Sequence, residues 1–548
     1  MGIDVRRYQD NNENKPPELR GSYSFDDQLS GLAYANFLLG FPTTAQRTTP
    51  RPNAYVRSWH SALYFQDDLK INQRVTFNYG LRYEYQTPWV ERFNRLFGFD
   101  PTTGNVVTAG TSIPTDLVPA VASTLPIVPA SQARYPTRSL LKTDGNNWDP
   151  RLGLAIRPLG DATTVVRIGF GVYNQVWPGN LALNATGGPW TATQTFFIQQ
   201  NVPSVSFPDP FTTSGQLSGV FDIAGVSPGF PAERTYQWNV SVGRQFWGTA
   251  IDIGYVGTHA LSIPYTEDLN LLHPSAIPYD SARRPYQRFN SASLTQTGSS
   301  SIYHGFNIQA DRRLAKGLSF NVNYTWAKSL TDTTLGGFAS PAEQNQYARR
   351  LERADDSLVR RHVLRFSYVY HLPFGRGQHF LENLSGARNQ VIGGWELSGI
   401  TTMAAGPRMS ASFSGTDPAD TNQFSGRPDR IADGNLSSGN MRDRIKAGQS
   451  IFDITAFVQP ETGRGFYGDS ARNILTGPGT ETWNIVVAKN FPLKAERARL
   501  QFRWEMFNAF NRANFFAPST NMSSPSDFGV VNGANSGRFM QFALRIDY

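Results

Sequence analysis

The feature that most constrains this chain is a strict alternation of apolar and polar residues in many short segments. In 76–85 every second residue is aromatic or aliphatic, and the residues between them are polar, charged or glycine. Segment 318–328 follows the same rule. Successive side chains of a strand point to opposite faces, so each segment predicts a strand with one apolar and one polar face. The alternation recurs in 238–242, 366–372, 500–506 and the C-terminal residues Phe542, Leu544, Ile546 and Tyr548.

Very short turns join the predicted strands in pairs, and much longer stretches separate the pairs. The pairs are 59–70 with 74–86, 148–158 with 162–174, 235–246 with 249–258, 302–314 with 317–328, and 481–491 with 497–507. The intervening stretches, such as 87–147 and 175–233, are rich in Pro, Gly, Ser, Thr and Asn. Tight turns at one end and long loops at the other are typical of a transmembrane antiparallel outer-membrane β-barrel, with its loops outside the cell.

Strand length agrees with this all-β fold. Roughly ten to twelve residues, rising ~3.3 Å each and tilted about 45°, climb ~25 Å, the height of the lipid-facing band. Further strands are predicted at 360–373, 391–403 and 537–548, with weaker ones near 20–38 and 189–200, which gives about 14–16 in all. Aromatic residues near strand ends predict an interfacial girdle, with ordinary core packing as the alternative. They are Trp59, Tyr83, Tyr85, Trp89, Trp238, Trp326 and Trp483.

Composition excludes several other classes. Charged residues make up 17% and aromatic residues 13%, the mean hydropathy is −0.39, and no run approaches the ~18 apolar residues of a spanning helix. The net charge of +8 comes from scattered basic residues without a recognition module, so we expect no nucleic-acid partner. The chain has no cysteine, which excludes disulfides, cysteine-based metal sites and a thiol nucleophile.

Short phrases along the chain resemble the C-terminal barrel of TonB-dependent receptors, and in particular the Oar-like group. They include Asn78-Tyr-Gly-Leu-Arg-Tyr-Glu84, Asp149-Pro-Arg-Leu-Gly153, Gly254-Tyr-Val-Gly-Thr-His259, Asn323-Tyr-Thr-Trp-Ala-Lys328 and Glu505-Met-Phe-Asn-Ala-Phe-Asn511. Their order and spread cover the chain from about residue 35 to the end. The resemblance implies a location in the outer membrane of a Gram-negative bacterium. It also implies that the final alternating residues, Phe542, Leu544, Ile546 and Tyr548, are the signal read by the barrel-assembly machinery.

The same resemblance implies parts that this sequence does not match. Receptors of the group have a signal peptide, a regulatory-like β-domain, a plug and a barrel of about 22 strands. The N-terminus has no apolar stretch of a secretory signal. We therefore expect an irregular segment at 1–19 and an N-terminally truncated barrel domain at 20–548, without a plug. Such a barrel would leave unpaired strand edges in lipid, so we expect that it does not close and insert alone. The TonB energy-coupling complex would be a partner only with the plug present.

No pattern of catalytic residues is recognisable, so we expect neither an enzyme nor a cofactor. The sequence has no His-Glu-x-x-His, Gly-x-Ser-x-Gly or Walker-type motif. The acidic pairs Asp67-Asp68 and Asp355-Asp356 have basic neighbours and are read as solvated or lumen residues, not as metal ligands. The oxygen-rich segment 415–433 resembles a calcium loop but lacks the EF-hand register, so an extracellular loop is favoured.

The leading functional hypothesis is uptake of a scarce solute by a TonB-dependent receptor. The loop aromatic residues Trp177, Trp190, Phe196 and Phe197 would suit a carbohydrate-like or siderophore-like ligand. A structural or adhesive surface protein, whose barrel anchors its loops, is the alternative. A soluble β-propeller enzyme would need a repeat of roughly 40–50 residues, which the sequence lacks.

Overall fold

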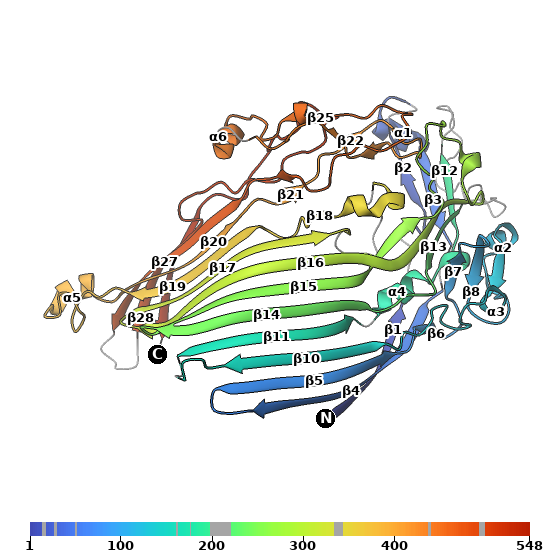
Figure 1. Cartoon of the computed structure of the whole chain (residues 1–548). Helices are drawn as coiled ribbons and strands as arrows, with labels where there is room; N and C mark the ends of the chain where they lie inside the picture. Colours follow the sequence, from blue (N-terminus) through green and yellow to red (C-terminus); the bar gives the residue numbers. More distant parts are fainter. Residues whose placement is uncertain are drawn as a thin grey trace.

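The computed structural model describes the chain except for residues 14–17, 27–29, 50–51, 161–162, 176, 198–220, 334–343, 437–439, 493–498 and 548. In this part of the chain one large sheet contains seventeen strands, three of which are short additions to it: β6 (Val90–Glu91), β13 (Phe221–Val226) and β18 (Ala354–Asp355). The other fourteen are antiparallel to their neighbours and form a curved wall (Figure 1). This confirms the predicted all-β architecture.

The fourteen strands follow the chain order around the wall. They are β1 (Gly2–Asn12), β4 (Ala54–Lys70), β5 (Val75–Gln86), β10 (Asn147–Ile156), β11 (Thr164–Gln175), β14 (Glu233–Phe246), β15 (Thr249–Asp268), β16 (Phe289–Ala315), β17 (Leu318–Thr331), β19 (His362–His371), β20 (Trp395–Ala404), β27 (Thr480–Pro492), β28 (Arg499–Phe507) and β29 (Phe539–Asp547). Each pairs with the next in this order, and no pairing joins β1 to β29 among the described residues. The described sheet is therefore open between these two strands.

Two of the tight turns show why the sequence forms hairpins here. Trp247 and Gly248 have φ values of 44° and 78°, and Lys316 and Gly317 have φ values of 51° and 79°. Two successive residues with positive φ match the type I′ turn, whose twist fits the twist of the flanking strands. Phe246 pairs with Thr249 across the first turn and Ala315 with Leu318 across the second, beside which the register of β16 and β17 shifts between Arg312 and Ala315. The predicted turn at 493–496 lies outside the described residues.

The inward and outward faces of the sheet follow from the alternation and the register. We call inward the face that carries Asn78, Gly80 and Arg82 of β5, and the pairing of β5 with β10 continues it through Asp149, Arg151 and Gly153. The opposite, outward face is apolar and exposed, for example at Leu81, Leu152, Ile168, Val242 and Ile253. A sheet with one polar and one apolar face is what the period of two predicts.

The loops gather at one end of the wall, which we call the mouth (Figure 1). They contain β2 (Ser22–Ser24), β3 (Thr44–Thr48), β7 (Phe97–Asp100), β8 (Asn105–Thr108), β9 (Ile127–Pro129), β12 (Thr193–Phe197), β21 (Arg408–Met409), β22 (Phe413–Ser414), β23 (Ser425–Gly426), β24 (Asp429–Arg430), β25 (Phe457–Val458) and β26 (Leu475–Thr476). The connections at the other end are short except for residues 372–394 between β19 and β20, so the predicted asymmetry holds for most of the wall.

The helices are short. They are α1 (Ala33–Leu39), α2 (Pro119–Thr124), α3 (Ala130–Ala133), α4 (Gly179–Asn184), α5 (Gly386–Ile392) and α6 (Met441–Lys446), with 3-10 turns at Ser281–Arg283, Gln346–Glu352, Gly188–Trp190 and Ile454–Ala456. None of them is part of the wall, and α5 lies at the turn end. No helix in the described residues is long and apolar enough to cross a membrane.

Three of the predicted segments are wrong in detail. Residues 1–19 are not all irregular, because β1 pairs with β4 over eleven residues, from Gly2 with Tyr64 to Asn12 with Ala54. Segment 20–38 forms β2 and α1 instead of a barrel strand, and Gly40 ends that helix with a φ of 73°. The strand predicted in 189–200 is β12, which pairs with β3 outside the wall. For β1 and β12 the pairing partner decided the outcome, and a local pattern does not identify it.

Candidate functional site

The buried apolar residues of the mouth form clusters of their own. One contains Val56, Trp89, Trp177, Leu181 and Phe230, and a second contains Phe97, Phe99, Trp190 and Phe289. Two more join residues of other loops. The first cluster reaches the wall through Val56, which lies on the inward face of β4 and is fully buried. Apolar burial therefore packs the loops together and fixes them to the inner edge of the wall.

Trp89 and Trp177 belong to this packing. The Trp89 indole Nε1 donates to the carbonyl oxygen of Trp177 at 2.9 Å, and the Trp177 backbone N donates to Oε1 of Gln86 at 2.7 Å. Each tryptophan is 5% exposed. The prediction of Trp89 as a girdle residue is therefore wrong, because its ring is enclosed by the loop layer.

Of the other loop aromatic residues, Trp190 is buried like Trp89 and Trp177. Trp190 is 2% exposed, and its indole Nε1 donates to Oδ1 of Asp116 at 2.9 Å. The backbone of Phe196 and Phe197 pairs with β3, whereas their side chains lie outside the described part. Trp177 and Trp190 thus stabilise the loop layer and present almost no surface to a ligand in this structure.

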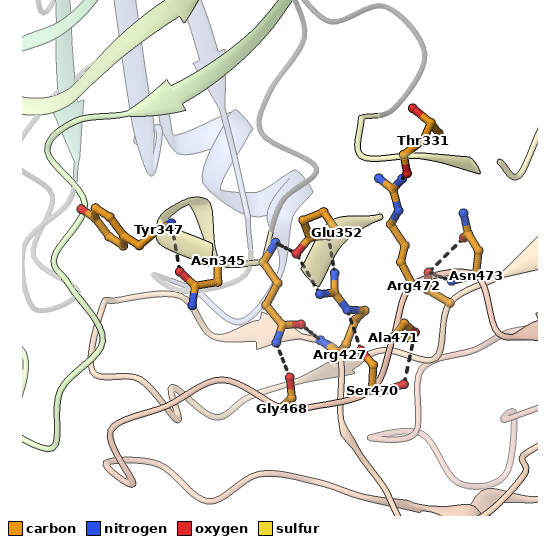
Figure 2. Close-up of polar contacts among 12 residues, drawn as sticks. Thr331, Asn345, Tyr347, Glu352, Arg427, Gly468, Ser470, Ala471, Arg472 and Asn473 are labelled. Atoms are coloured by element: carbon orange, nitrogen blue, oxygen red, sulfur yellow. Dashed lines mark hydrogen bonds and ion pairs between the residues drawn. The ribbon is translucent and has the colours of Figure 1, made fainter. Parts of the chain in front are cut away.

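A buried ion pair joins two of the long loops at the mouth (Figure 2). Glu352, from the loop between β17 and β19, is fully buried, and its carboxylate accepts two hydrogen bonds of 2.8 Å from the Arg427 guanidinium. Arg427 lies in the loop between β20 and β27, and its Nε donates to the carbonyl oxygen of Ser470 at 2.9 Å. The geometry is the bidentate one that makes arginine–carboxylate pairs strong and directional.

Gln344 completes this contact. Its backbone N donates to Glu352 Oε1 at 3.2 Å, and its side-chain amide donates to the carbonyl oxygen of Gly468 at 2.8 Å. Its Oε1 accepts the backbone N–H of Arg427 at 2.5 Å. We call Gln344, Glu352 and Arg427 the loop latch, since they hydrogen-bond with one another across the two loops. Sequence reasoning missed it, because its two charges are 75 residues apart.

Arg472 holds the same two loops at a second point, which Figure 2 also shows. It is 6% exposed, and its Nη2 donates to the carbonyl oxygens of Thr331 at 2.8 Å and Thr333 at 3.2 Å. Burial lowers the pKa of its guanidinium, although the nearby Glu352 carboxylate acts in the opposite direction. The adjacent Asn473 donates to the carbonyl oxygen of Asp355 at 2.7 Å.

The predicted acidic pairs have structural partners. The Asp355 carboxylate forms ion pairs with Arg361 at 3.1 Å and with Arg408 at 3.2 Å. Asp67 pairs with Tyr79 of β5 and Asp68 with Asn78, so the two carboxylates point to different faces of the sheet. Among the residues that the structure describes, no group of three His, Cys, Asp or Glu side chains could hold a metal ion.

The oxygen-rich segment 415–433 uses its carboxylates internally. Asp417 accepts the backbone N–H groups of Thr421 at 3.1 Å and Asn422 at 2.5 Å, which closes a tight turn. Asp429 accepts two hydrogen bonds from Arg464, and the Nη2–Oδ1 distance is 2.8 Å. The carboxylates of Asp417 and Asp429 thus have hydrogen-bond partners within the loop between β20 and β27.

The Asp429–Arg464 pair gives a testable pH dependence. Hydrogen bonds from Arg464 lower the pKa of Asp429 below its ordinary value of 3.8. A carboxylate with a lowered folded-state pKa stabilises the folded loop above the unfolded pKa and loses that contribution as the pH falls through the lowered value. We expect backbone exchange in 429–430 and 457–467, corrected for intrinsic rates, to accelerate below a pH of about 4. Asp429→Asn should exchange fast already at neutral pH, whereas the control Asp527→Asn should behave as wild type; an unchanged profile in Asp429→Asn would contradict the assignment.

The inward wall contains a hollow of about 400 Å³ between β4, β5, β10, β11 and β14. Gly80, Gly153, Gly169 and Gly171 line its floor, and the side chains of Asn78, Asn239 and Tyr173 lie over the last three of these glycines. Its polar lining includes Gln66, Asp67, Asp68, Asn78, Arg82, Asp149, Arg151, Gln237 and Asn239. Arg151 also lies over the Tyr173 ring, with its guanidinium carbon 4.7 Å from the ring centre. We call this the lumen hollow; it offers many hydrogen-bonding groups and an aromatic edge to a polar molecule.

The outward face carries most of the predicted girdle. Trp59 and Trp326 are 50% and 53% exposed, and Tyr83 packs on Trp148 with ring centres 4.5 Å apart. By register, Tyr85, Trp238 and Trp483 lie on the same face. At the C-terminal edge the outward Phe542, Leu544 and Ile546 are 69%, 72% and 61% exposed, and Tyr548 lies outside the described residues. Contact of these residues with lipid and with the assembly machinery remains a prediction.

The sequence profile of the outer membrane beta barrel domain family matches residues 1–541. The chain belongs to this family. It is therefore an outer-membrane β-barrel protein of a Gram-negative bacterium, as the asymmetry of turns and loops predicts. No curated protein matches the chain.

Several solved outer-membrane proteins are similar to this barrel in structure. The ferripyoverdine receptor of the outer membrane of Pseudomonas aeruginosa has 8% identity, with 91% of this chain and 40% of that chain covered and a TM-score of 0.41. The outer membrane transporter YddB from Escherichia coli has 8% identity, coverages of 92% and 51%, and a TM-score of 0.40. The ferric citrate transporter FecA, in its unliganded form, has 9% identity, coverages of 92% and 52%, and a TM-score of 0.40. The chain thus spans 40–52% of the length of these three proteins.

Proposed function

We propose that this outer-membrane barrel is part of a TonB-dependent receptor of the Oar-like group, and that it takes up a scarce solute. The family phrases in the sequence, such as Asn78-Tyr-Gly-Leu-Arg-Tyr-Glu84, support this proposal, and so does a wall with a polar inward face. The energy-coupling complex would act through a plug. The barrel-assembly machinery would read the outward residues Phe542, Leu544 and Ile546 of β29.

The lumen hollow is the observation that carries this proposal. It lies on the inward face, below the packed loops of the mouth, and it combines a glycine-lined floor with hydrogen-bonding side chains. A solute site needs a concave surface with a few polar groups that fix orientation. The mixture of Arg151, Asn78 and Asn239 with the Tyr173 edge suits a polar, hydroxyl-rich molecule, in other words a carbohydrate-like or siderophore-like solute.

The first experiment compares host strains on a panel of limiting solutes that includes ferric siderophores and oligosaccharides. We expect deletion of the gene and inactivation of TonB to abolish growth on the same solute, because one pathway requires both. Normal growth of the deletion strain on every solute, with a loss of surface attachment, would favour the adhesive alternative.

With that solute identified, the lumen hollow can be tested directly. Arg151→Ala removes one charged donor from its border, and we expect the concentration for half-maximal uptake to rise by about tenfold or more, since a hydrogen bond to a charged group contributes about 1.5–3 kcal/mol. The matched control is Arg167→Ala, which lies on the same face but pairs with Asp252 at 3.5 Å outside the hollow. Equal effects of the two substitutions would exclude the hollow as the site.

A further inference from the structure

A second cavity, of about 650 Å³, lies at the mouth end of the wall beside β1, β4 and the loop that precedes β10. Four basic residues line it: Arg7, Arg57, Arg138 and Lys142. Apolar surface from Trp59, Val90 and Leu141 completes it. We call it the rim cavity. Neither the uptake of a solute nor the loop latch uses any of its four cations.

The rim cavity faces away from the lumen. In β4, Ala54, Val56 and Ser58 point inward and are buried beneath the loop layer. The residues between them, including Arg57 and Trp59, therefore point outward. Arg7 of β1 lies directly opposite Trp59 in the register, and its guanidinium carbon is 5.7 Å from the centre of the Trp59 indole. The cavity is thus part of the outer surface of the barrel.

The positive charge of the rim cavity has no counter-charge in the described part of the chain. No acidic residue lines it, and none of its four basic residues forms an ion pair with a carboxylate there. Arg57 Nε is buried without a hydrogen-bond partner, and Arg138 Nε makes only a long contact of 3.4 Å with Oδ1 of Asn94. Cations held together without a carboxylate repel one another, and an anion between them would remove that repulsion.

The height of the cavity on the wall indicates which anion would bind between these cations. Trp59, Tyr85 and the Tyr83–Trp148 pair form an aromatic band on the outward face just below it. Such bands mark the boundary between hydrocarbon and head groups. Arg57 is two residues beyond Trp59 toward the mouth, a rise of ~7 Å along the strand. The cations therefore lie at the level of the lipid head groups of the outer leaflet.

We propose that the rim cavity binds the phosphoryl groups of a phosphorylated glycolipid in the outer leaflet. Arg7, Arg57 and Arg138 supply planar guanidinium groups that match phosphate oxygens, and Lys142 adds a point charge. Trp59, Val90 and Leu141 border the part of the lipid where head group and acyl chains meet. Inorganic phosphate shares the anion chemistry but not this apolar contact.

Native mass spectrometry of the full chain in detergent tests the proposal, with diphosphoryl lipid A, lipid A without phosphates and inorganic phosphate as probes. We expect diphosphoryl lipid A to bind about tenfold or more tightly than the dephosphorylated form, and inorganic phosphate not to displace it. Arg57→Gln with Arg138→Gln should weaken the binding of diphosphoryl lipid A by about tenfold or more. Displacement by inorganic phosphate, or equal binding of both lipids, would overturn the proposal.

The chain offers a matched control. Arg244 and Arg312 lie on the same outward face at the turn end, where Arg312 contacts the carbonyl oxygen of Trp247 at 3.5 Å. Arg244→Gln with Arg312→Gln removes the same charge from the opposite rim and should leave binding unchanged; an equal loss in both double variants would indicate unspecific attraction and overturn the site. If the glutamine variant does not fold, Arg57→Lys with Arg138→Lys keeps the charge but loses the planar guanidinium groups, so it should bind diphosphoryl lipid A more weakly than wild type does, and unchanged binding would overturn the site.

Discussion

Replacing Glu352 with glutamine is expected to destabilise the loop layer of the mouth by about 3–5 kcal/mol, the usual cost of leaving one partner of a buried ion pair uncompensated. Arg427 would keep its charge in a site where Glu352 is fully buried and supplies two hydrogen bonds of 2.8 Å. Hydrogen exchange of the full chain in lipid measures this directly, because segments 344–361 and 425–472 should lose protection together. The rest of the wall should stay protected.

Two controls separate charge burial from loss of contact. Asp433→Asn removes an exposed ion pair with Arg430, at 3.8 Å, and should cost less than about 1 kcal/mol. Glu352→Leu combined with Arg427→Met removes both charges, and it should restore much of the protection that Glu352→Gln loses. If Glu352→Gln left both loops as protected as in wild type, the loop latch would not hold them together.

Replacing Val242 with arginine is expected to make the free energy of insertion less favourable by about 2–4 kcal/mol. This is the cost of a charged residue near the middle of the lipid face of a barrel. Val242 points outward between Val166 and Ile253, and it is 45% exposed to what would be hydrocarbon. Unfolding by urea in outer-membrane fractions of the host that produces the variant, read as the gel shift between folded and unfolded forms, measures the change.

Its neighbour provides the control. Ser241 lies on the inward face, opposite Gly254, so Ser241→Arg places the same side chain in the water-filled lumen. We expect that variant to fold as wild type within about 0.5 kcal/mol. Similar losses in the two variants would mean that the outward face of β14 does not contact lipid.

The sequence predicted the parts of the fold that depend on local geometry. Side chains alternate along a strand, so the pattern of 76–85 determined both that β5 forms and which of its residues point outward. Trp247-Gly248 and Lys316-Gly317 determined two hairpins in the same way, because the twist of a type I′ turn fits the twist of the strands that it joins. The long polar stretches between the pairs determined that one end of the wall carries the loops.

Only the tertiary structure decided which partner each residue has. β1 shows little apolar alternation beyond Ile3 and Val5, and it became a wall strand because β4 supplies hydrogen bonds along its whole length. Trp89 and Trp177 look like exposed aromatic residues in the sequence, and they are buried because two loops meet over the inward face of β4. The Glu352–Arg427 pair and the four cations of the rim cavity come from segments far apart in the chain. A period of two is a property of the backbone at each residue, whereas burial and charge compensation depend on which distant segments the fold brings together.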